Sequence, residues 1–198
     1  MNRVVVFSSA TARKYCLLSR LKRRVWTILI LMAIGFMAFR GFLYWKQHRF
    51  DAAITAAARR YGLDPALIRA VIWQESRFNP GVRGRAGELG LMQIREAAAA
   101  EWAAAEHIKS FKHTDCLDPD TNILAGSYYL KSVLRHYART DDPIPYALAE
   151  YNAGRGNVLK WLGGSASTNS AAFIAQIGFP GTKAYVTAIM DQCNYYRR

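Results

Sequence analysis

The first 50 residues contain no aspartate or glutamate, although they carry ten lysines and arginines. The rest of the chain holds 17 basic and 14 acidic side chains, so +10 of the total charge of +13 lies before position 51. A protein that binds nucleic acid more often carries its basic surface on the folded part of the chain. The distribution of charge therefore argues against nucleic acid as a partner.

Cysteine is scarce, and the chain lacks the spacings that ligate metals. Cys16, Cys116 and Cys193 form no C-x-x-C pair. No helical pair of histidines with a glutamate between them occurs, so the zinc-protease pattern is absent as well. We therefore expect no metal and no cofactor. Cys116 and Cys193 leave two alternatives open, a disulfide or two buried free thiols.

A long run without charge follows the basic residues. The segment VWTILILMAIGFMAF, Val25 to Phe39, contains no charged residue, and four basic residues lie within 20–24. As a helix continued to Trp45, the run would span roughly 31 Å, which matches the ~30 Å hydrocarbon core of a bilayer. We expect a basic cytoplasmic tail over 1–24, a transmembrane signal-anchor over 25–45 and a folded domain over 46–198.

Two other interpretations of this run are a cleavable signal peptide and a buried core helix. No small-x-small cleavage site follows Phe39, and a core helix would leave the seven preceding basic residues unexplained. The positive-inside rule places the N-terminus in the cytoplasm. We therefore expect a single-pass protein of the bacterial inner membrane whose folded domain lies in the periplasm.

Helical periodicity dominates from residue 47 onward, and no convincing strand alternation occurs. Asp-Pro pairs at 64–65, 118–119 and 142–143 have the form of an N-cap followed by proline at the first helical position. They predict three helix starts, the third helix ending at Gly154, and a further helix is expected near 182–196. The fold class is therefore predicted to be mainly α.

Glu75 lies where an apolar residue is expected. On the helix that starts at Pro65, the apolar stripe contains Ile68, Val71 and Ile72, and Glu75 is the next position of the same face. A glutamate at a helix end usually leans into water. If it stays buried instead, desolvation raises its pKa, as a general acid for glycosidic cleavage requires.

Four segments resemble, in order and in rough spacing, the motifs of the bacterial lytic transglycosylases. These enzymes have an SLT-type catalytic domain of the goose-type lysozyme superfamily, and the resemblance covers roughly residues 47–195. It implies a lysozyme-like, mainly α domain that acts on the glycan strands of peptidoglycan without a cofactor. The segments are ESRFNP at 75–80, GLMQI at 90–94, LAEYNAG at 148–154 and AYV at 184–186.

The first two motifs imply roles for four residues. By resemblance, Glu75 is the sole catalytic acid and base, and Ser76 orients its carboxylate by a hydrogen bond. Met92 lines the groove, and Gln93 offers its amide to sugar hydroxyl or acetamido groups.

The last two motifs imply roles for three more. Tyr151 places its hydroxyl near the reacting sugar, Asn152 braces the loop, and Tyr185 shapes the cleft. Three of the seven positions also have a structural interpretation: Met92 and Tyr185 as ordinary core, and Asn152 as part of a helix C-terminus.

The resemblance supplies only one carboxylate, which implies closure of a 1,6-anhydro ring in place of attack by water. The loop GRAGELG departs from the family pattern, with Gly84 where serine is common and Glu88 where alanine is common. Glu88 and Glu150 are therefore candidates for a second acid, and a hydrolytic muramidase is the first alternative. The second is a peptidoglycan-binding module without activity that acts with envelope-assembly proteins.

Overall fold

The structure, a computed structural model, describes residues 9–198, with side chains from Lys22 onward. Residues 1–8 of the expected basic tail and the thiol of Cys16 lie outside the described residues. The chain divides into two compact units, Met1–His48 and Arg49–Arg198.

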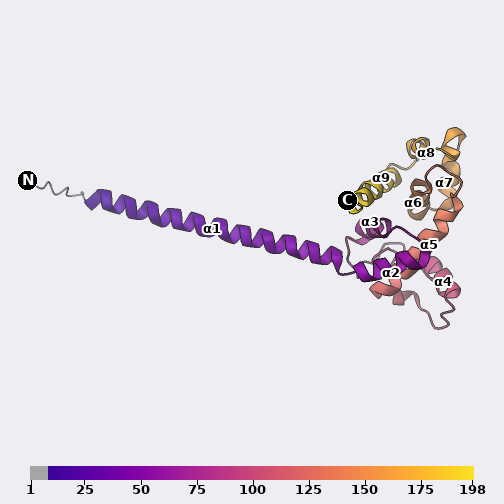
Figure 1. The fold of residues 1–198 in the computed structure, drawn as a ribbon, viewed down its shortest axis with the longest axis horizontal. Coiled ribbons are helices and arrows are strands. Elements are labelled where there is room, and N and C mark those ends of the chain that lie inside the picture. Colours follow the sequence, from indigo (N-terminus) through magenta and orange to yellow (C-terminus); the bar gives the residue numbers. More distant parts are fainter. Residues whose placement is uncertain (1–8) are drawn as a thin grey trace, which may run out of the picture. The chain divides into compact units, whose positions relative to one another are not determined.

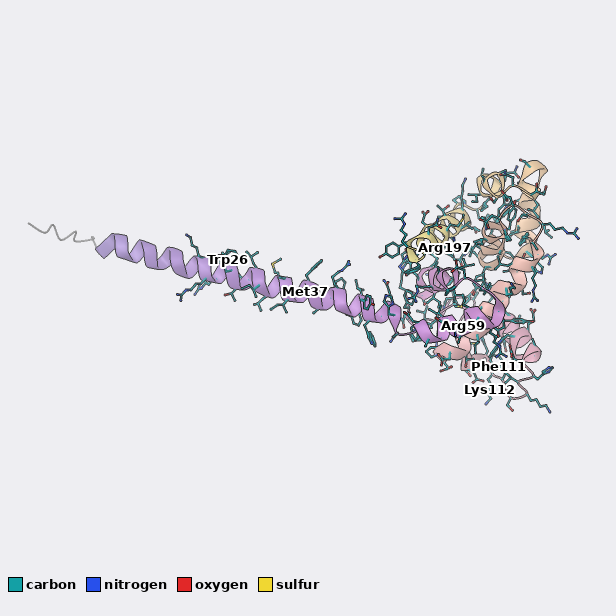
Figure 2. The ribbon with its side chains drawn as sticks, in the orientation of Figure 1. Trp26, Met37, Arg59, Phe111, Lys112 and Arg197 are labelled. Atoms are coloured by element: carbon teal, nitrogen blue, oxygen red, sulfur yellow. The ribbon has the colours of Figure 1, made fainter. Side chains whose placement is uncertain are left out.

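The first unit contains one long helix, α1 (Ser9–His48), shown in indigo and purple in Figure 1. Many of its apolar side chains are exposed in this unit: Trp26 and Met37, which project outward in Figure 2, are 66% and 73% exposed. Within the described part of the chain, this is the one helix whose length and composition suit a membrane span. It extends past both ends of the expected span, 25–45.

The second unit is built from helices, and no β-strand occurs among the described residues apart from two isolated bridges. The helix bounds are α2 (Asp51–Tyr61), α3 (Pro65–Ser76), α4 (Glu96–Ala105), η1 (His113–Leu117), α5 (Pro119–His136), α6 (Pro143–Ala153), α7 (Arg155–Trp161), η2 (Gly164–Ser167), α8 (Ser170–Gln176) and α9 (Pro180–Tyr196).

The three Asp-Pro pairs start helices as predicted. The carboxylate of Asp64 accepts a hydrogen bond from the backbone N–H of Ala66 at the start of α3. Asp118 caps α5 and Asp142 caps α6 in the same way. Because each cap pairs a backbone N–H that the helix leaves open, these three boundaries follow from local chemistry.

The core forms where α3 packs against α9 and where α6 packs against α5 and α9. Figure 1 shows α3 and α9 side by side, although about 100 residues separate them in the sequence. Ile68, Val71 and Ile72 are fully buried, as the apolar stripe predicts, and Val186 and Ile189 of α9 are also fully buried. This packing brings the end of α3 next to α9.

One detail differs from the expectation. Helix α9 begins at Pro180, two residues before the predicted start, because proline suits the first helical position. The connector before α8 contains the short 3-10 helix η2.

Cys116 and Cys193 are buried free thiols. Of the two alternatives, the structure therefore contains the one without a disulfide. Burial raises the pKa of Cys116 to about 11, so this thiol stays protonated at neutral pH.

Candidate active site

Glu75 occupies the last turn of α3 and is half-buried. The helix stops directly after it because Arg77 and Phe78 both have left-handed backbones, with φ of 50° and 59°. Such conformations are costly for residues other than glycine. The buried ring of Phe78 and a 3.0 Å hydrogen bond from Arg49 to its carbonyl oxygen hold the turn. The chain therefore leaves the helix sharply, and Glu75 stays at its end.

Tyr185 reaches Glu75 from α9. Its hydroxyl donates a 2.5 Å hydrogen bond to Oε1 of Glu75. Burial raises the pKa of Glu75, the hydrogen bond from Tyr185 lowers it, and the charge of Glu88 raises it again, which leaves the pKa at about 7. The carboxyl group is therefore close to half protonated at neutral pH, as a general acid and base should be.

Burial raises the pKa of Tyr185 well above its usual value, and the charge of Glu75 raises it further. The tyrosine hydroxyl therefore keeps its proton and remains a donor to Glu75. From the sequence, Tyr185 was expected to shape the cleft or to belong to the ordinary core, whereas in the structure it contacts the candidate acid directly.

Gly90 allows the GLMQI loop to pass close to α5. It has a left-handed backbone with φ of 76°, and a Cβ atom at this position would lie 2.2 Å from Nδ2 of Asn122 and 2.5 Å from the carbonyl oxygen of Cys116. The glycine is therefore required by packing inside the domain.

Asn122, which the sequence analysis did not single out, holds this loop in place. Its Oδ1 accepts a 2.7 Å hydrogen bond from the N–H of Met92, and its Nδ2 donates to the carbonyl oxygens of Leu89 and Cys116. The side chain is 1% exposed. The sequence feature that could have identified Asn122 is its position on the buried face of α5, four residues after the capping Asp118, where an apolar residue would be expected.

Met92 and Gln93 face different directions. The Met92 side chain is fully buried against Gly126 and does not line the cleft, in contrast to the expected role. Gln93 does line it, but its Nε2 donates to the carbonyl oxygens of Val82 and Gly90 within the loop. Its side-chain oxygen is the part of the amide that these two bonds leave for other partners.

Tyr151 and Asn152 connect α6 to its neighbours. The Tyr151 hydroxyl donates a 2.8 Å hydrogen bond to the carbonyl oxygen of Met92. Oδ1 of Asn152 accepts a hydrogen bond from the Thr182 hydroxyl, which links α6 to α9. Both residues line the cleft and also brace its walls.

Ser76 is buried, and its hydroxyl donates to the carbonyl oxygen of Ile72, one turn earlier in α3. Its hydrogen bond in this structure is thus made to the helix backbone.

A cleft of about 440 Å³ contains the candidate acid. Four of the seven predicted site residues line it. Tyr185 bonds to Glu75 without lining the cleft, and Ser76 and Met92 do not line it either. The four are Glu75, Gln93, Tyr151 and Asn152.

The two other candidate acids, Glu88 and Glu150, also line this cleft. Glu88 forms an ion pair with Arg95 at 2.8 Å. Glu150 is 4% exposed; it accepts a 2.5 Å hydrogen bond from the Tyr137 hydroxyl and lies 3.1 Å from Nδ1 of His136. With Glu101, which also lines the cleft, four carboxyl groups in different surroundings therefore meet there.

The chain matches the model of the transglycosylase SLT domain family over residues 52–174. It is 33% identical over 157 residues to the soluble lytic murein transglycosylase of Escherichia coli K12, covering 76% of this chain and 24% of that protein. It is 37% identical over 119 residues to the membrane-bound lytic murein transglycosylase F of Desulfosudis oleivorans, covering 59% of this chain and 24% of that protein. The chain thus spans about a quarter of the length of these relatives.

Solved structures agree with the sequence comparison. The 70-kDa soluble lytic transglycosylase in complex with bulgecin A superimposes with a TM-score of 0.68 at 30% identity, covering 76% of this chain and 24% of that chain. An inactive mutant of the lytic transglycosylase Slt from Pseudomonas aeruginosa gives a TM-score of 0.67 at 30% identity, covering 73% and 23%. The expected mainly α, lysozyme-like fold is confirmed.

Replacement of Asn122 tests how the loop is held. We expect Asn122→Ala to lower the free energy of unfolding by about 2–4 kcal/mol, because it leaves the N–H of Met92 and the carbonyl oxygen of Cys116 without their buried partner. The measurement is chemical denaturation followed by near-ultraviolet circular dichroism. Asn194→Ala, an exposed asparagine of α9, is the control and should change stability by less than about 0.5 kcal/mol. Equal effects of the two changes would contradict this role.

Proposed function

The chain belongs to the SLT transglycosylase family, and from this premise we propose that it cleaves the β-1,4 bond between N-acetylmuramic acid and N-acetylglucosamine in peptidoglycan. One observation carries the proposal: Glu75 lines the cleft with a pKa of about 7 and a hydrogen bond from Tyr185. Such a group gives and takes a proton near neutral pH.

In the first step, protonated Glu75 donates its proton to the glycosidic oxygen while the bond from that oxygen to C1 of the muramic acid sugar breaks. The acetamido oxygen of the same sugar forms a bond to C1 and carries the positive charge into its ring. The Tyr185 hydroxyl then stabilises the carboxylate that remains on Glu75. The hydrogen bond is therefore most useful after the proton has left.

In the second step, the Glu75 carboxylate takes the proton from the C6 hydroxyl of the same sugar. The C6 oxygen bonds to C1, the acetamido oxygen leaves, and a 1,6-anhydro ring closes. Glu75 returns to its protonated form, and no water is consumed. An intramolecular nucleophile reaches an effective molarity of ~10⁵ M or more, which supports a mechanism with one acid residue.

Hydrolysis is a second candidate, because further carboxyl groups, among them Glu88 and Glu150, line the same cleft. Glu88 or Glu150 would have to activate a water molecule as a base. The chemical nature of the product ends distinguishes the two reactions.

We expect the full chain, solubilised in detergent, to release muropeptides with 1,6-anhydro ends from purified peptidoglycan. Glu75→Gln should reduce release by about 10²- to 10⁴-fold, because the variant has no proton to donate. Mass spectrometry identifies the anhydro ends, which are one water lighter than reducing ends. The control is Glu96→Gln, an exposed glutamate of α4 that does not line the cleft.

Reducing ends in place of anhydro ends would favour the hydrolytic muramidase. If no muropeptide is released but the protein sediments with the polymer, the chain is a binding module that acts with envelope-assembly proteins.

We also propose that α1 anchors the protein in the bacterial inner membrane, with the N-terminus in the cytoplasm and the catalytic domain in the periplasm. The exposed apolar side chains of α1 support this, as does the basic charge before them. Relatives of this chain include membrane-bound lytic murein transglycosylases. The anchor would restrict cleavage to glycan strands near the membrane surface.

The anchor is tested by fractionation of cells that produce the full chain. We expect the protein to stay in the membrane pellet after high-salt and alkaline washes, and protease added to the periplasmic side to digest the domain. Ile34→Arg, in the middle of the apolar run, should weaken insertion by roughly 3–4 kcal/mol, because it adds an arginine and removes an isoleucine, and should increase the soluble fraction. A shortened, soluble mature form of the unaltered chain would contradict the anchor.

A further inference from the structure

Glu88 lies in the loop between α3 and α4 and lines the same cleft as Glu75. Its backbone is fixed on both sides. The carbonyl oxygen of Glu88 accepts a 2.7 Å hydrogen bond from the N–H of Gly84, and the next residue, Leu89, forms isolated bridges with Arg83 and Ile94. The position of this side chain is therefore set by the loop.

Both carboxylate oxygens of Glu88 are held. Oε1 accepts hydrogen bonds from Nε and Nη2 of Arg95 at 3.0 and 2.8 Å, and Oε2 accepts one from the N–H of Ala86 at 3.0 Å. Burial acts to raise the pKa of Glu88, but hydrogen bonds from its own N–H, from Arg95 and from Ala86 together lower it below the usual value. The group is thus ionised at neutral pH, when Glu75 is close to half protonated.

Gly84 leaves the space that this carboxylate occupies. A Cβ atom on Gly84 would lie 2.2 Å from Oε2 and 2.9 Å from Cβ of Glu88. Any side chain at position 84 would therefore displace the Glu88 carboxylate from its hydrogen bonds. A surface ion pair by itself contributes little stability.

Of the other two acidic groups in the cleft, Glu150 is held by Tyr137 and His136, and Glu101 is exposed on α4. The charge of Glu88 is the one that acts on Glu75 and raises its pKa. The remaining groups near Glu75 are the tyrosines Tyr185 and Tyr151, both of which burial keeps protonated.

We propose that Glu88 is a second working carboxylate of this active site: its fixed negative charge stabilises the positive charge that develops on the sugar ring when Glu75 donates its proton. This inference rests on the proposed cleavage of glycan strands. Glu88 forms no covalent bond and transfers no proton. A carboxyl group that can donate its proton near neutral pH, beside an ionised carboxylate, is an arrangement that favours a glycosidic transition state of oxocarbenium character.

The test compares the full chain in detergent with Glu88→Gln, Glu88→Asp and the control Glu96→Gln, on soluble peptidoglycan glycan strands over a range of pH. Glutamine keeps the size of the side chain and accepts the hydrogen bond from Ala86, but it carries no charge. We expect Glu88→Gln to lower kcat by about 10- to 100-fold with KM nearly unchanged. Glu88→Asp, which keeps the charge, should lie closer to the unaltered protein.

The pH profile provides a readout that a purely structural role would not move. Loss of the Glu88 charge lowers the pKa of Glu75, so Glu75 loses its proton at lower pH. The basic limb of kcat/KM should therefore shift toward acid in Glu88→Gln and stay in place in Glu96→Gln. Glu88→Gln could fold poorly, which its melting temperature would reveal. The pH midpoint of the basic limb, which does not depend on the amount of folded protein, and the activity of Glu88→Asp would then still test the inference.

The inference would be overturned if Glu88→Gln and Glu96→Gln had the same kcat and the same midpoint of the basic limb of kcat/KM. It would also be overturned if Glu88→Asp were as inactive as Glu88→Gln. Reducing ends that disappear in Glu88→Gln would also overturn it, because they would make Glu88 a base for water. In each of these cases the unaltered protein is active. If it releases nothing, the proposed function itself fails.

Discussion

The burial of Glu75 against Tyr185 is the constraint on which the site depends. Raising the pKa of this carboxyl from 4.5 to about 7 costs the folded state about 3 kcal/mol once the group is ionised in both states. No such cost exists below pH 4.5, where the group is protonated in both states, so stability falls as pH rises from about 4.5 to about 7. The packing of α3 against α9 offsets this cost and supplies the tyrosine.

The rest of the domain positions groups around this pair. Asn122 ties the GLMQI loop to α5, and Tyr151 ties the same loop to α6 through the carbonyl oxygen of Met92. Because these bonds are made to backbone atoms, the loop keeps its shape whatever its exposed side chains do. The cleft is therefore preformed, with Gln93 on its wall and ionised Glu88 near the acid.

Local chemistry made part of this structure predictable. The Asp-Pro caps and the stripe that ends in Glu75 need only neighbours within one or two turns, and both were predicted. The hydrogen bond from Tyr185 to Glu75 joins residues 110 positions apart. Helical periodicity predicts which face of a helix is buried, but it does not predict which residue of another helix contacts that face. For the same reason the sequence left Met92 open between the cleft and the core, and the three bonds of Asn122 were not predicted, since both depend on which helix lies beneath the loop.

The most direct test of this account is a titration of the Glu75 carboxyl by carbon-13 NMR, in the full chain labelled at glutamate side chains, with Glu75→Gln to assign the signal. The account predicts a midpoint near pH 7, because burial outweighs the hydrogen bond from Tyr185. A midpoint near 4.5, the ordinary value for a glutamate, would contradict it, because Glu75 would then be fully ionised at neutral pH and have no proton to donate.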